Sequence, residues 1–170
     1  MKLLILGNIA SGKTTLAKKI SKIYNVEYYE MDNIVYDQDN NKRSSSEQKN
    51  IVTIILKNRE YIIEGMLRNY YDLIIPKVST IIFLDYNKKI IRRRLFKRYI
   101  LDRLGIGNNN YKLDKELYNK FKDYQDNYDN SIIKEIINKY PNKLIIIKNN
   151  KELKKFFKAL DNGFEYKEKI

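Results

Sequence analysis

The 170-residue chain contains no cysteine and no histidine. Without cysteine it cannot form a disulfide, and without both residue types it cannot build the zinc sites that Cys and His side chains form. The same absence excludes the Ser-His-Asp triad and the Cys-His pair as nucleophile systems. Any proton transfer by this chain therefore depends on Asp, Glu, Lys or Tyr side chains.

Long apolar segments are also absent. The N-terminal apolar run ends at Leu6, before Gly7, whereas a membrane span needs about 20 apolar residues and a signal peptide also needs a longer apolar segment. No other apolar run approaches that length. These absences predict a soluble cytoplasmic protein without a membrane partner.

The 21 Asp and Glu residues are outnumbered by 34 Lys and Arg residues, and the formal net charge is +13. A basic balance favours polyanionic partners such as nucleic acid, or phosphorylated ligands. However, Lys, Asn, Ile and Tyr are abundant along the whole chain, and such a compositional bias would place many of the lysines on ordinary solvated surface. The arginines are more informative, because five of the eight lie between residues 92 and 103.

Short apolar runs alternate with segments of helical periodicity along the chain. The apolar runs predict five strands, at residues 2–6, 26–29, 61–63, 80–84 and 144–147. The periodic segments predict helices at residues 13–24, 90–104, 113–140 and 151–160. A further helix follows a polar loop within residues 37–50, where the sequence Ser44-Ser45-Ser46-Glu47 offers N-cap chemistry.

Apolar strands separated by helices indicate an α/β fold in which helices cover both faces of a parallel sheet. We expect a single domain over residues 1–170, since no repeat or linker interrupts the pattern. In such a sheet, ligands bind beyond the carboxyl ends of the strands. The candidate functional segments are therefore residues 7–14, 30–32, 64–68 and those from Asp85 onward.

The segment after the first strand matches the phosphate-binding pattern G-x-x-x-x-G-K-[ST] at residues 7–14. Gly7 and Gly12 allow the backbone to curl, so that successive N–H groups converge on phosphate oxygens. Lys13 supplies a positive charge for the β- and γ-phosphates, and Thr14 offers a hydroxyl to Mg²⁺. A chance match in a chain of this length has odds on the order of 1%, and the expected strand before it and helix after it make chance less probable still.

The pattern therefore predicts that ATP and Mg²⁺ bind this chain. The predicted ATP-binding residues are Gly7, Asn8, Ile9, Ala10, Ser11, Gly12, Lys13, Thr14 and Thr15. A guanine-reading N-K-x-D sequence is absent, because Asn87-Lys88-Lys89 is followed by Ile90. The single D-x-x-G sequence, at residues 102–105, closes a basic helix rather than following a strand.

The chain resembles the adenylate-kinase-related small P-loop kinases, and most closely the group known as DNA topology modulation proteins. The resemblance spans nearly the whole chain. It rests on residues 7–14, Asp32, Glu64-Gly65, Phe83-Leu84-Asp85 and the arginine-rich helix. It implies a five-stranded parallel sheet of order 2-3-1-4-5, an acceptor-side segment at about residues 32–58 and a short lid at about residues 99–113.

The resemblance also implies roles for the segment Glu64-Gly65-Met66-Leu67-Arg68. Its spacing is that of the Asp-Gly-Phe-Pro-Arg segment of adenylate kinases, with Glu in place of Asp and Leu in place of Pro. The resemblance implies that Glu64 supports the waters of the bound metal, so that Thr14 and Glu64 form the metal site. It further implies that Gly65 and Arg68 bind the acceptor.

Two further sets of residues take roles from the resemblance. Arg94 and Arg98 lie one helical turn apart and match lid-base arginines that resemble built-in arginine fingers. Asp32, in Glu30-Met31-Asp32, resembles the D-x-D of shikimate-type kinases and implies an acid that contacts the acceptor hydroxyl. Together with Lys13, these three residues form the predicted catalytic set.

Several of these residues also have structural interpretations. Glu64 could cap the segment after its strand, and Asp32 could be a turn residue. Asp85 could cap the next helix rather than lie near the metal. Arg43 could bind an acceptor phosphate, but a structural role is the stronger interpretation.

We predict a kinase that transfers the γ-phosphoryl group of Mg·ATP to a small acceptor, such as a nucleotide, a nucleoside or another compound with a hydroxyl or phosphate group. The short lid and the lack of arginine in residues 113–140 argue against a standard adenylate kinase. The alternative is an ATP-binding protein associated with nucleic acid, which the net charge and the basic residues 88–98 favour. A degenerate kinase that binds nucleotide for regulation is a third interpretation. We expect a monomer or a homodimer.

Overall fold

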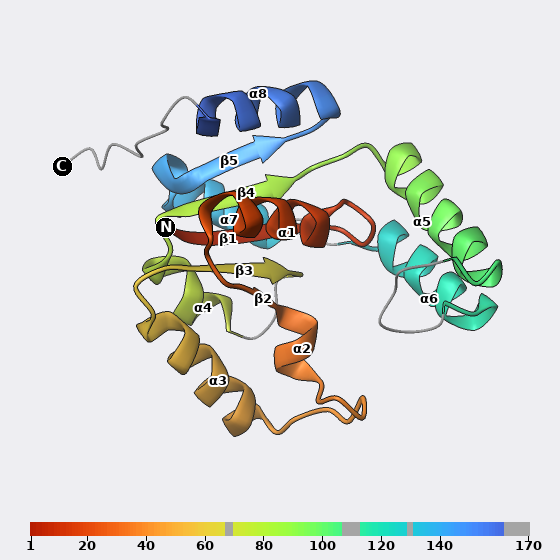
Figure 1. The fold of residues 1–170 in the computed structure, drawn as a ribbon, viewed down its shortest axis with the longest axis horizontal. Helices are drawn as coiled ribbons and strands as arrows, with labels where there is room; N and C mark the ends of the chain where they lie inside the picture. Colours follow the sequence, from red (N-terminus) through yellow and green to blue (C-terminus); the bar gives the residue numbers. More distant parts are fainter. Residues whose placement is uncertain (67–69, 107–112, 129–130, 162–170) are drawn as a thin grey trace.

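The computed structural model describes residues 1–66, 70–106, 113–128 and 131–161. Its strands form one five-stranded parallel sheet, in the order β2-β3-β1-β4-β5, so the predicted fold class and strand order are confirmed (Figure 1). The strands are β1 (Lys2–Gly7), β2 (Tyr28–Glu30), β3 (Tyr61–Gly65), β4 (Thr80–Leu84) and β5 (Leu144–Ile147). The register pairs Leu6 with Gly65 and Gly7 with Leu84, so the segments after β1, β3 and β4 begin at the same edge of the sheet.

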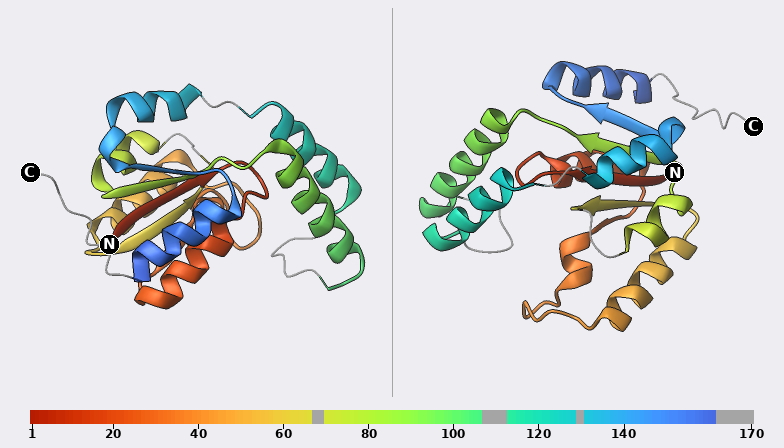
Figure 2. Two further views of the ribbon diagram at one scale, coloured as in Figure 1. Left: turned by 90° about the horizontal axis from the view of Figure 1, so that it is seen from above. Right: turned by 180° about the vertical axis from the view of Figure 1, so that it is seen from behind.

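Helices cover both faces of the sheet (Figures 1 and 2). One face packs against α1 (Lys13–Tyr24) and α8 (Asn150–Asp161). The other face packs against α2 (Met31–Val35), α3 (Ser45–Lys57), α4 (Tyr71–Ile74) and α7 (Ser131–Lys139). Successive side chains of β1 alternate between the two cores, with Leu3 and Ile5 on the first face and Leu4 and Leu6 on the second.

Helices α5 (Lys88–Arg103) and α6 (Lys115–Asp126) pack against each other and extend beyond the sheet as an arm (Figures 1 and 2). Aromatic side chains join the two helices. The ring of Tyr118 lies 4.8 Å from that of Tyr99 and 6.4 Å from that of Phe96, measured between centroids. Arg92 of α5 also forms an ion pair with Asp126 of α6.

The helix predicted over residues 113–140 is wrong, because the structure contains two separate helices there. α6 ends at Asp126 with Asn127 as its C-cap, and α7 begins at Ser131. The sequence at 126–130 is Asp-Asn-Tyr-Asp-Asn. Asn and Asp side chains compete for backbone hydrogen bonds and are unfavourable inside helices, which explains the interruption.

Two other local predictions have clear outcomes. The N-cap chemistry before α3 is confirmed as a full capping box, in which Ser44 accepts from the Glu47 N–H and the Glu47 carboxylate accepts from the Ser44 N–H. The proposed capping of α5 by Asp85 is wrong. Asn87 caps this helix, and its side chain accepts a 2.9 Å hydrogen bond from the Lys89 N–H. Within the described residues, no helix has both the length and the apolar character needed to cross a bilayer.

Candidate functional site

Residues 7–12 form a tight turn between the end of β1 and the start of α1, the strand–loop–helix arrangement that the sequence predicts. Ala10 and Gly12 have positive φ angles of 60° and 103°. The N–H of Ser11 donates to the carbonyl of Asn8 over 3.1 Å. A side chain at Gly7 would come within 2.8 Å of Ser11 Oγ and 2.9 Å of the Leu84 carbonyl, so this position needs glycine.

Lys13 is the first residue of α1, where a helix presents free N–H groups and the positive end of its dipole. Its Nζ donates to the Asn8 carbonyl over 3.1 Å. Desolvation lowers the pKa of Lys13, while the charges of Glu64 and Asp32 raise it and that of Arg98 lowers it. Asp32, Glu64 and Arg98 therefore all act electrostatically on Lys13.

Thr14 and Glu64 are joined directly, because Thr14 Oγ1 donates to Glu64 Oε1 over 2.5 Å. Glu64 is only 4% exposed at the carboxyl end of β3. Burial raises the pKa of Glu64, and the positive charge of Lys13 and the Thr14 hydroxyl oppose this shift. The charges of Glu30 and Asp32 raise the pKa of Glu64 further. The Glu64 carboxyl group, at the end of β3, thus faces Thr14 at the start of α1.

The Thr14–Glu64 pair fits a magnesium ion. A threonine hydroxyl that donates its hydrogen to a carboxylate keeps lone pairs for a cation. Within the described residues, no group of three or more Asp, Glu, His or Cys side chains forms an all-protein metal cage. Mg²⁺ does not require such a cage, because it retains waters and binds one or two protein oxygens together with substrate phosphates.

The two predicted arginines both lie on α5 and are both half-buried. Arg94 Nη1 donates to the Ser11 carbonyl over 2.7 Å, and its Nη2 donates to Asn150 Oδ1 over 3.2 Å. The guanidinium carbon of Arg94 lies 4.2 Å from the centre of the Tyr86 ring. Arg94 is therefore held against the loop backbone, whereas Arg98 acts electrostatically on Lys13.

The structure describes two of the three predicted acceptor residues, Asp32 and Gly65. Asp32 lies in the first turn of α2, exposed at its surface. Gly65 ends β3 and allows close packing, since a Cβ there would lie 2.5 Å from Met31 Cβ. Arg68 lies outside the described residues. The structure thus brings Asp32 and Gly65 to the same sheet edge as Lys13.

The remaining predicted ATP-binding residues differ in exposure. Asn8 and Ser11 are buried, with exposed fractions of 8% and 1%. Ile9 and Ala10 are half-buried, and Thr15 is exposed on the first turn of α1. The Asn8 side chain accepts from the Ile9 N–H over 2.6 Å and therefore stabilises the turn.

Arg43 has the structural role that the sequence favours for it. Its Nη1 donates to the carbonyls of Asn33, over 2.6 Å, and Ile34, over 3.2 Å, and also to that of Tyr36. These carbonyls belong to the end of α2, where backbone acceptors lack helical partners. Arg43 thus satisfies the C-terminus of α2.

Two residues near the site were missed by sequence reasoning: Asn150 and Gln125. Asn150 follows β5, so the rule that ligand sites lie beyond the carboxyl ends of strands could have identified it. Tyr86 follows β4 and lies in the candidate segment from Asp85 onward, but no role was predicted for it. Gln125 had no local signal, because it contacts the loop from α6, more than a hundred residues away in sequence.

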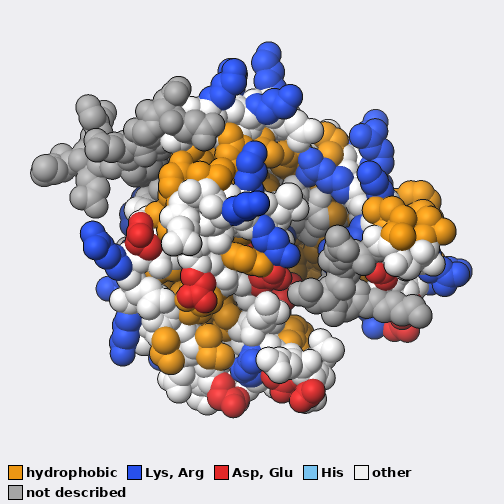
Figure 3. Space-filling view, in the orientation of Figure 1, with side chains coloured by type: hydrophobic (Ala, Val, Ile, Leu, Met, Phe, Trp, Pro, Cys, Tyr) orange, Lys and Arg blue, Asp and Glu red, His pale blue; other side chains and the backbone are white. Residues whose placement is uncertain are grey.

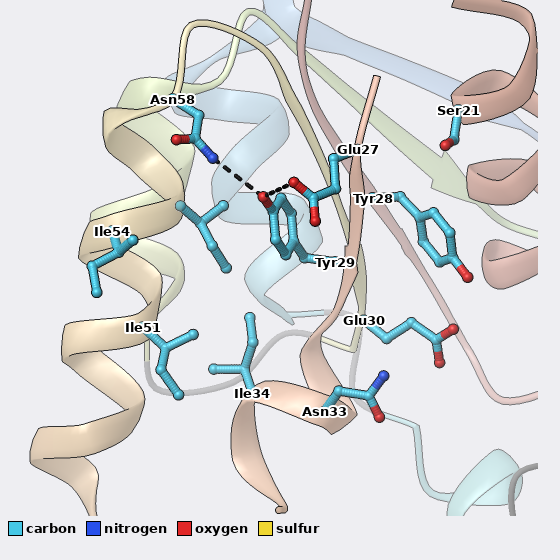
Figure 4. A pocket seen from close by; sticks show the side chains of 11 residues that line it. Ser21, Glu27, Tyr28, Tyr29, Glu30, Asn33, Ile34, Ile51, Ile54 and Asn58 are labelled. Carbon is cyan, nitrogen blue, oxygen red and sulfur yellow. Dashed lines mark hydrogen bonds between the residues drawn. The ribbon is translucent and has the colours of Figure 1, made fainter. Parts of the chain in front are cut away.

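A separate hollow of about 600 Å³ lies along β2 and beside α2 and α3 (Figure 4). Isoleucine side chains from α2 and α3, including Ile34, Ile51 and Ile54, line it together with the polar groups of β2. The Tyr29 hydroxyl donates to Glu27 over 2.5 Å and accepts from Asn58. None of residues 7–14 lines this hollow.

Basic side chains outnumber acidic ones on the face of the molecule shown in Figure 3. Four cations of α5, Lys89, Arg93, Lys97 and Arg103, are exposed. Arg92 is also exposed, but it is paired with Asp126.

Comparisons with known proteins identify the fold. No protein-family model matches the sequence, and no curated protein matches it. Solved structures do match. A shikimate kinase from Bacteroides thetaiotaomicron superposes with a TM-score of 0.55 at 14% identity, covering 94% of this chain and 97% of its own.

A deoxyadenosine kinase from M. mycoides with bound dATP gives a TM-score of 0.56 at 14% identity, over 95% of this chain and 100% of its own. A sugar kinase from Janibacter sp. gives a TM-score of 0.52 at 13% identity, over 96% of each chain. At these identities the likeness establishes the fold alone, which is that of the small P-loop kinases.

Proposed function

We propose that this chain is a kinase that transfers the γ-phosphoryl group of Mg·ATP to a small acceptor. The observation that carries the proposal is the Thr14–Glu64 hydrogen bond beside Lys13, in a loop that turns from a central strand into a helix. The structural neighbours named as shikimate, deoxyadenosine and sugar kinases support the same class of reaction. Their acceptors differ, so the acceptor of this chain is proposed only as a small molecule.

In the proposed reaction, the backbone N–H groups of residues 9–14 and the Lys13 ammonium hold the phosphates of ATP. Thr14 and Glu64 would hold Mg²⁺, which supplies charge neutralisation between the phosphate oxygens. Arg98 stabilises the charge that spreads over the transferred phosphoryl group, because its guanidinium offers fixed donors to several oxygens.

The acceptor oxygen attacks the γ-phosphorus, and the bond from that phosphorus to the β,γ-bridging oxygen breaks to release ADP. Where the acceptor is a hydroxyl group, Asp32 accepts its proton. Where the acceptor is a phosphate, no base is required. Gly65 and Arg68 belong to the acceptor side, together with the segment at about residues 32–58. The lid proposed at about residues 99–113 includes residues 107–112, which lie outside the described residues.

The test is an ADP-release assay over nucleosides, nucleoside monophosphates, sugars and small hydroxy acids. We expect one acceptor class to stimulate ADP release well above the rate with water. Lys13→Ala should abolish ATP binding and turnover, whereas Lys18→Ala, an exposed lysine on the same helix, should leave both unchanged. Equal affinity for ATP in the wild type and Lys13→Ala would refute the proposed phosphate site.

A second candidate function is association with nucleic acid. The observation that favours it is the exposed row of Lys89, Arg93 and Lys97, four residues apart along one side of α5. Exposed cations in a row can contact successive phosphates of a duplex. This function ranks second, because Arg94, which contacts the loop, and Arg98 have a sufficient explanation in phosphoryl transfer.

A further inference from the structure

We infer that Gln125 is a positioning residue that holds the phosphate loop in the shape required to receive the phosphates of a nucleotide. Gln125 lies near the end of α6 and is fully buried, with 0% exposure. Its Nε2 donates to the Ile9 carbonyl of the loop over 2.9 Å and to the Ile91 carbonyl of α5 over 3.4 Å. The inference rests on the proposed function, because it concerns the same phosphate site.

The contact with Ile9 orients the next peptide N–H of the loop. In a trans peptide the carbonyl and the following N–H point in opposite directions. With the Ile9 carbonyl turned toward Gln125, the Ala10 N–H is directed to the opposite side of the loop. Ala10 has a φ angle of 60°, a left-handed backbone conformation that is uncommon for residues other than glycine and that the surrounding contacts must stabilise.

A second side chain from the arm holds the loop in the same way. Arg94 of α5 donates to the Ser11 carbonyl over 2.7 Å, which directs the Gly12 N–H away from Arg94 by the same peptide geometry. The carbonyls of Ile9 and Ser11 are thus held by one side chain from each helix of the arm. The N–H groups of Ala10 and Gly12, on either side of Ser11, are fixed in this way and can contribute to an anion-binding loop.

Reciprocal contacts join α6 to the loop more firmly. The Asn8 side-chain Nδ2 donates to the backbone carbonyl of Gln125 over 3.4 Å, while the Gln125 side chain donates to the neighbouring Ile9. Gln125, a residue of α6, therefore contacts both the loop and α5. This residue thus links the two helices of the arm to the loop.

The chemistry of the buried amide supports a positioning role over simple core filling. The Gln125 Nε2 group faces the carbonyl oxygens of Ile9 and Ile91. If the side-chain amide were turned by 180°, Oε1 would face these two oxygens and could accept no hydrogen bond from them. In the observed orientation, Oε1 has no hydrogen-bond donor among the described residues. Burying a half-satisfied amide is unfavourable, and an apolar side chain would fill the same space without this cost.

Gln125→Met tests the inference, because methionine keeps the length of the side chain and removes its donor. The matched control is Gln48→Met. Gln48 is also buried, at 5% exposure, and its Nε2 donates to the Arg43 carbonyl over 2.7 Å, but it lies on α3. In calorimetric titrations with Mg·ADP, we expect the dissociation constant to rise about tenfold in Gln125→Met and to stay within about twofold of the wild type in Gln48→Met.

A spectroscopic readout separates positioning from general destabilisation. The chain has three alanines, Ala10, Ala17 and Ala159, so labelling with ¹⁵N-alanine gives one amide signal from the loop and two from helices. In the nucleotide-free protein, Gln125→Met should shift or broaden the Ala10 signal and leave the other two unchanged. Gln48→Met should leave the Ala10 signal unchanged.

The outcomes separate this inference from the kinase proposal. A folded Gln125→Met variant with wild-type affinity, or with weaker affinity but an unchanged Ala10 signal, would overturn the inference. If this variant does not fold, Gln125→Leu decides, since its smaller apolar side chain also removes the donor and should also weaken Mg·ADP binding. If the wild type binds Mg·ADP but phosphorylates no acceptor, the kinase proposal fails and the inference stands. If the wild type binds no nucleotide, both fail.

Discussion

Two oppositely charged side chains of the site are held away from solvent. Desolvation lowers the pKa of Lys13, and burial raises the pKa of Glu64, although each charge favours the ionised form of the other. Burial therefore outweighs their attraction, which is the usual result when a charge pair lacks further partners. A nucleotide and Mg²⁺ would supply such partners to Lys13 and Glu64 respectively.

The lowered pKa of Lys13 predicts proton uptake on nucleotide binding at alkaline pH. Bound phosphates favour the ammonium form, so the complex regains the proton that free Lys13 releases below its ordinary pKa of 10.5. We expect the proton uptake to grow as the pH rises toward 10.5, with a parallel loss of affinity. The free energy of unfolding of the nucleotide-free protein should rise with pH, whereas the nucleotide affinity should fall. The reason is that the unfolded chain binds the Lys13 proton more tightly than the folded protein does. Deprotonation of Lys13 below its ordinary pKa of 10.5 therefore favours the folded state.

Titration calorimetry of Mg·ADP binding, in buffers with different heats of ionisation, measures this uptake directly. Lys18→Ala should show the same uptake as the wild type, since Lys18 is exposed on the outer side of α1. Constant affinity and no proton uptake up to pH 10.5 would show that Lys13 does not contact the phosphates.

Gly65 offers a second test at the residue scale. A Cβ at this position would lie 2.5 Å from Met31 Cβ and 2.8 Å from Met31 Cγ. Met31 is buried and begins α2, so Gly65→Ala should displace the start of that helix together with Asp32. We expect a loss of about 1–3 kcal/mol in the free energy of unfolding, measured by urea titration, and a larger loss in acceptor-dependent turnover than in Mg·ADP affinity.

Gly105→Ala is the matched control for Gly65→Ala. Gly105 has a φ angle of 72°, and no described atom lies within 4 Å of the added Cβ. Among the described residues, only the cost of the left-handed backbone then applies, which is about 1–2 kcal/mol, and this variant is a control for stability alone. Unchanged acceptor-dependent turnover in folded Gly65→Ala would argue against a link between Gly65, α2 and the acceptor.

At the scale of helices and strands, local pattern predicts most of the fold. The runs of Ile and Leu place β4 and β5 at the observed residues, and Gly12 and Asn25 bound α1 as expected from the sequence. The parallel order follows from alternation of strands and helices together with the resemblance to P-loop kinases. The capping box before α3 is likewise readable from four residues.

The elements that were missed depend on features outside those patterns. α2 has five residues, too few for helical periodicity to be visible. The division between α6 and α7 follows from Asp and Asn residues inside an otherwise amphipathic segment. Gln125 could not be predicted, because its role depends on how α6 packs against α5 and the loop. The motif therefore identifies Lys13 and Thr14, and the resemblance to P-loop kinases identifies Glu64 and Arg94, whereas the tertiary contacts of Gln125 had no signal in the sequence.

At the scale of the whole molecule, two kinds of positive charge are present. Lys13, the first residue of α1, is half-buried and desolvated beside the phosphate loop. Lys89, Arg93, Lys97 and Arg103 are exposed on the arm. Salt screens exposed charges strongly and partly buried ones much less. We therefore expect a large polyanion to interact mainly with the exposed cations of the arm. We expect a nucleotide to interact mainly with Lys13.

This separation predicts different salt dependence for the two ligands. If four exposed cations of α5 contact duplex phosphates, raising the salt from about 50 to 200 mM should weaken duplex binding roughly a hundredfold. Mg·ADP affinity should change only severalfold over the same range, because buried amides and Lys13 hold the phosphates. The two affinities can be compared by fluorescence anisotropy with a labelled duplex and by calorimetry with Mg·ADP.

Charge-matched variants assign each affinity to its residues. Arg93→Ala with Lys97→Ala should weaken duplex binding and flatten its salt dependence, since two phosphate contacts are removed, while Mg·ADP affinity stays unchanged. Lys18→Ala with Lys22→Ala removes the same charge from the exposed side of α1 and should have a smaller effect on the duplex. Lys13→Ala should abolish Mg·ADP binding and leave the duplex bound. Duplex binding that resists salt, or that requires Lys13, would place the nucleic acid in the nucleotide site and contradict the assignment of that site to a small-molecule kinase.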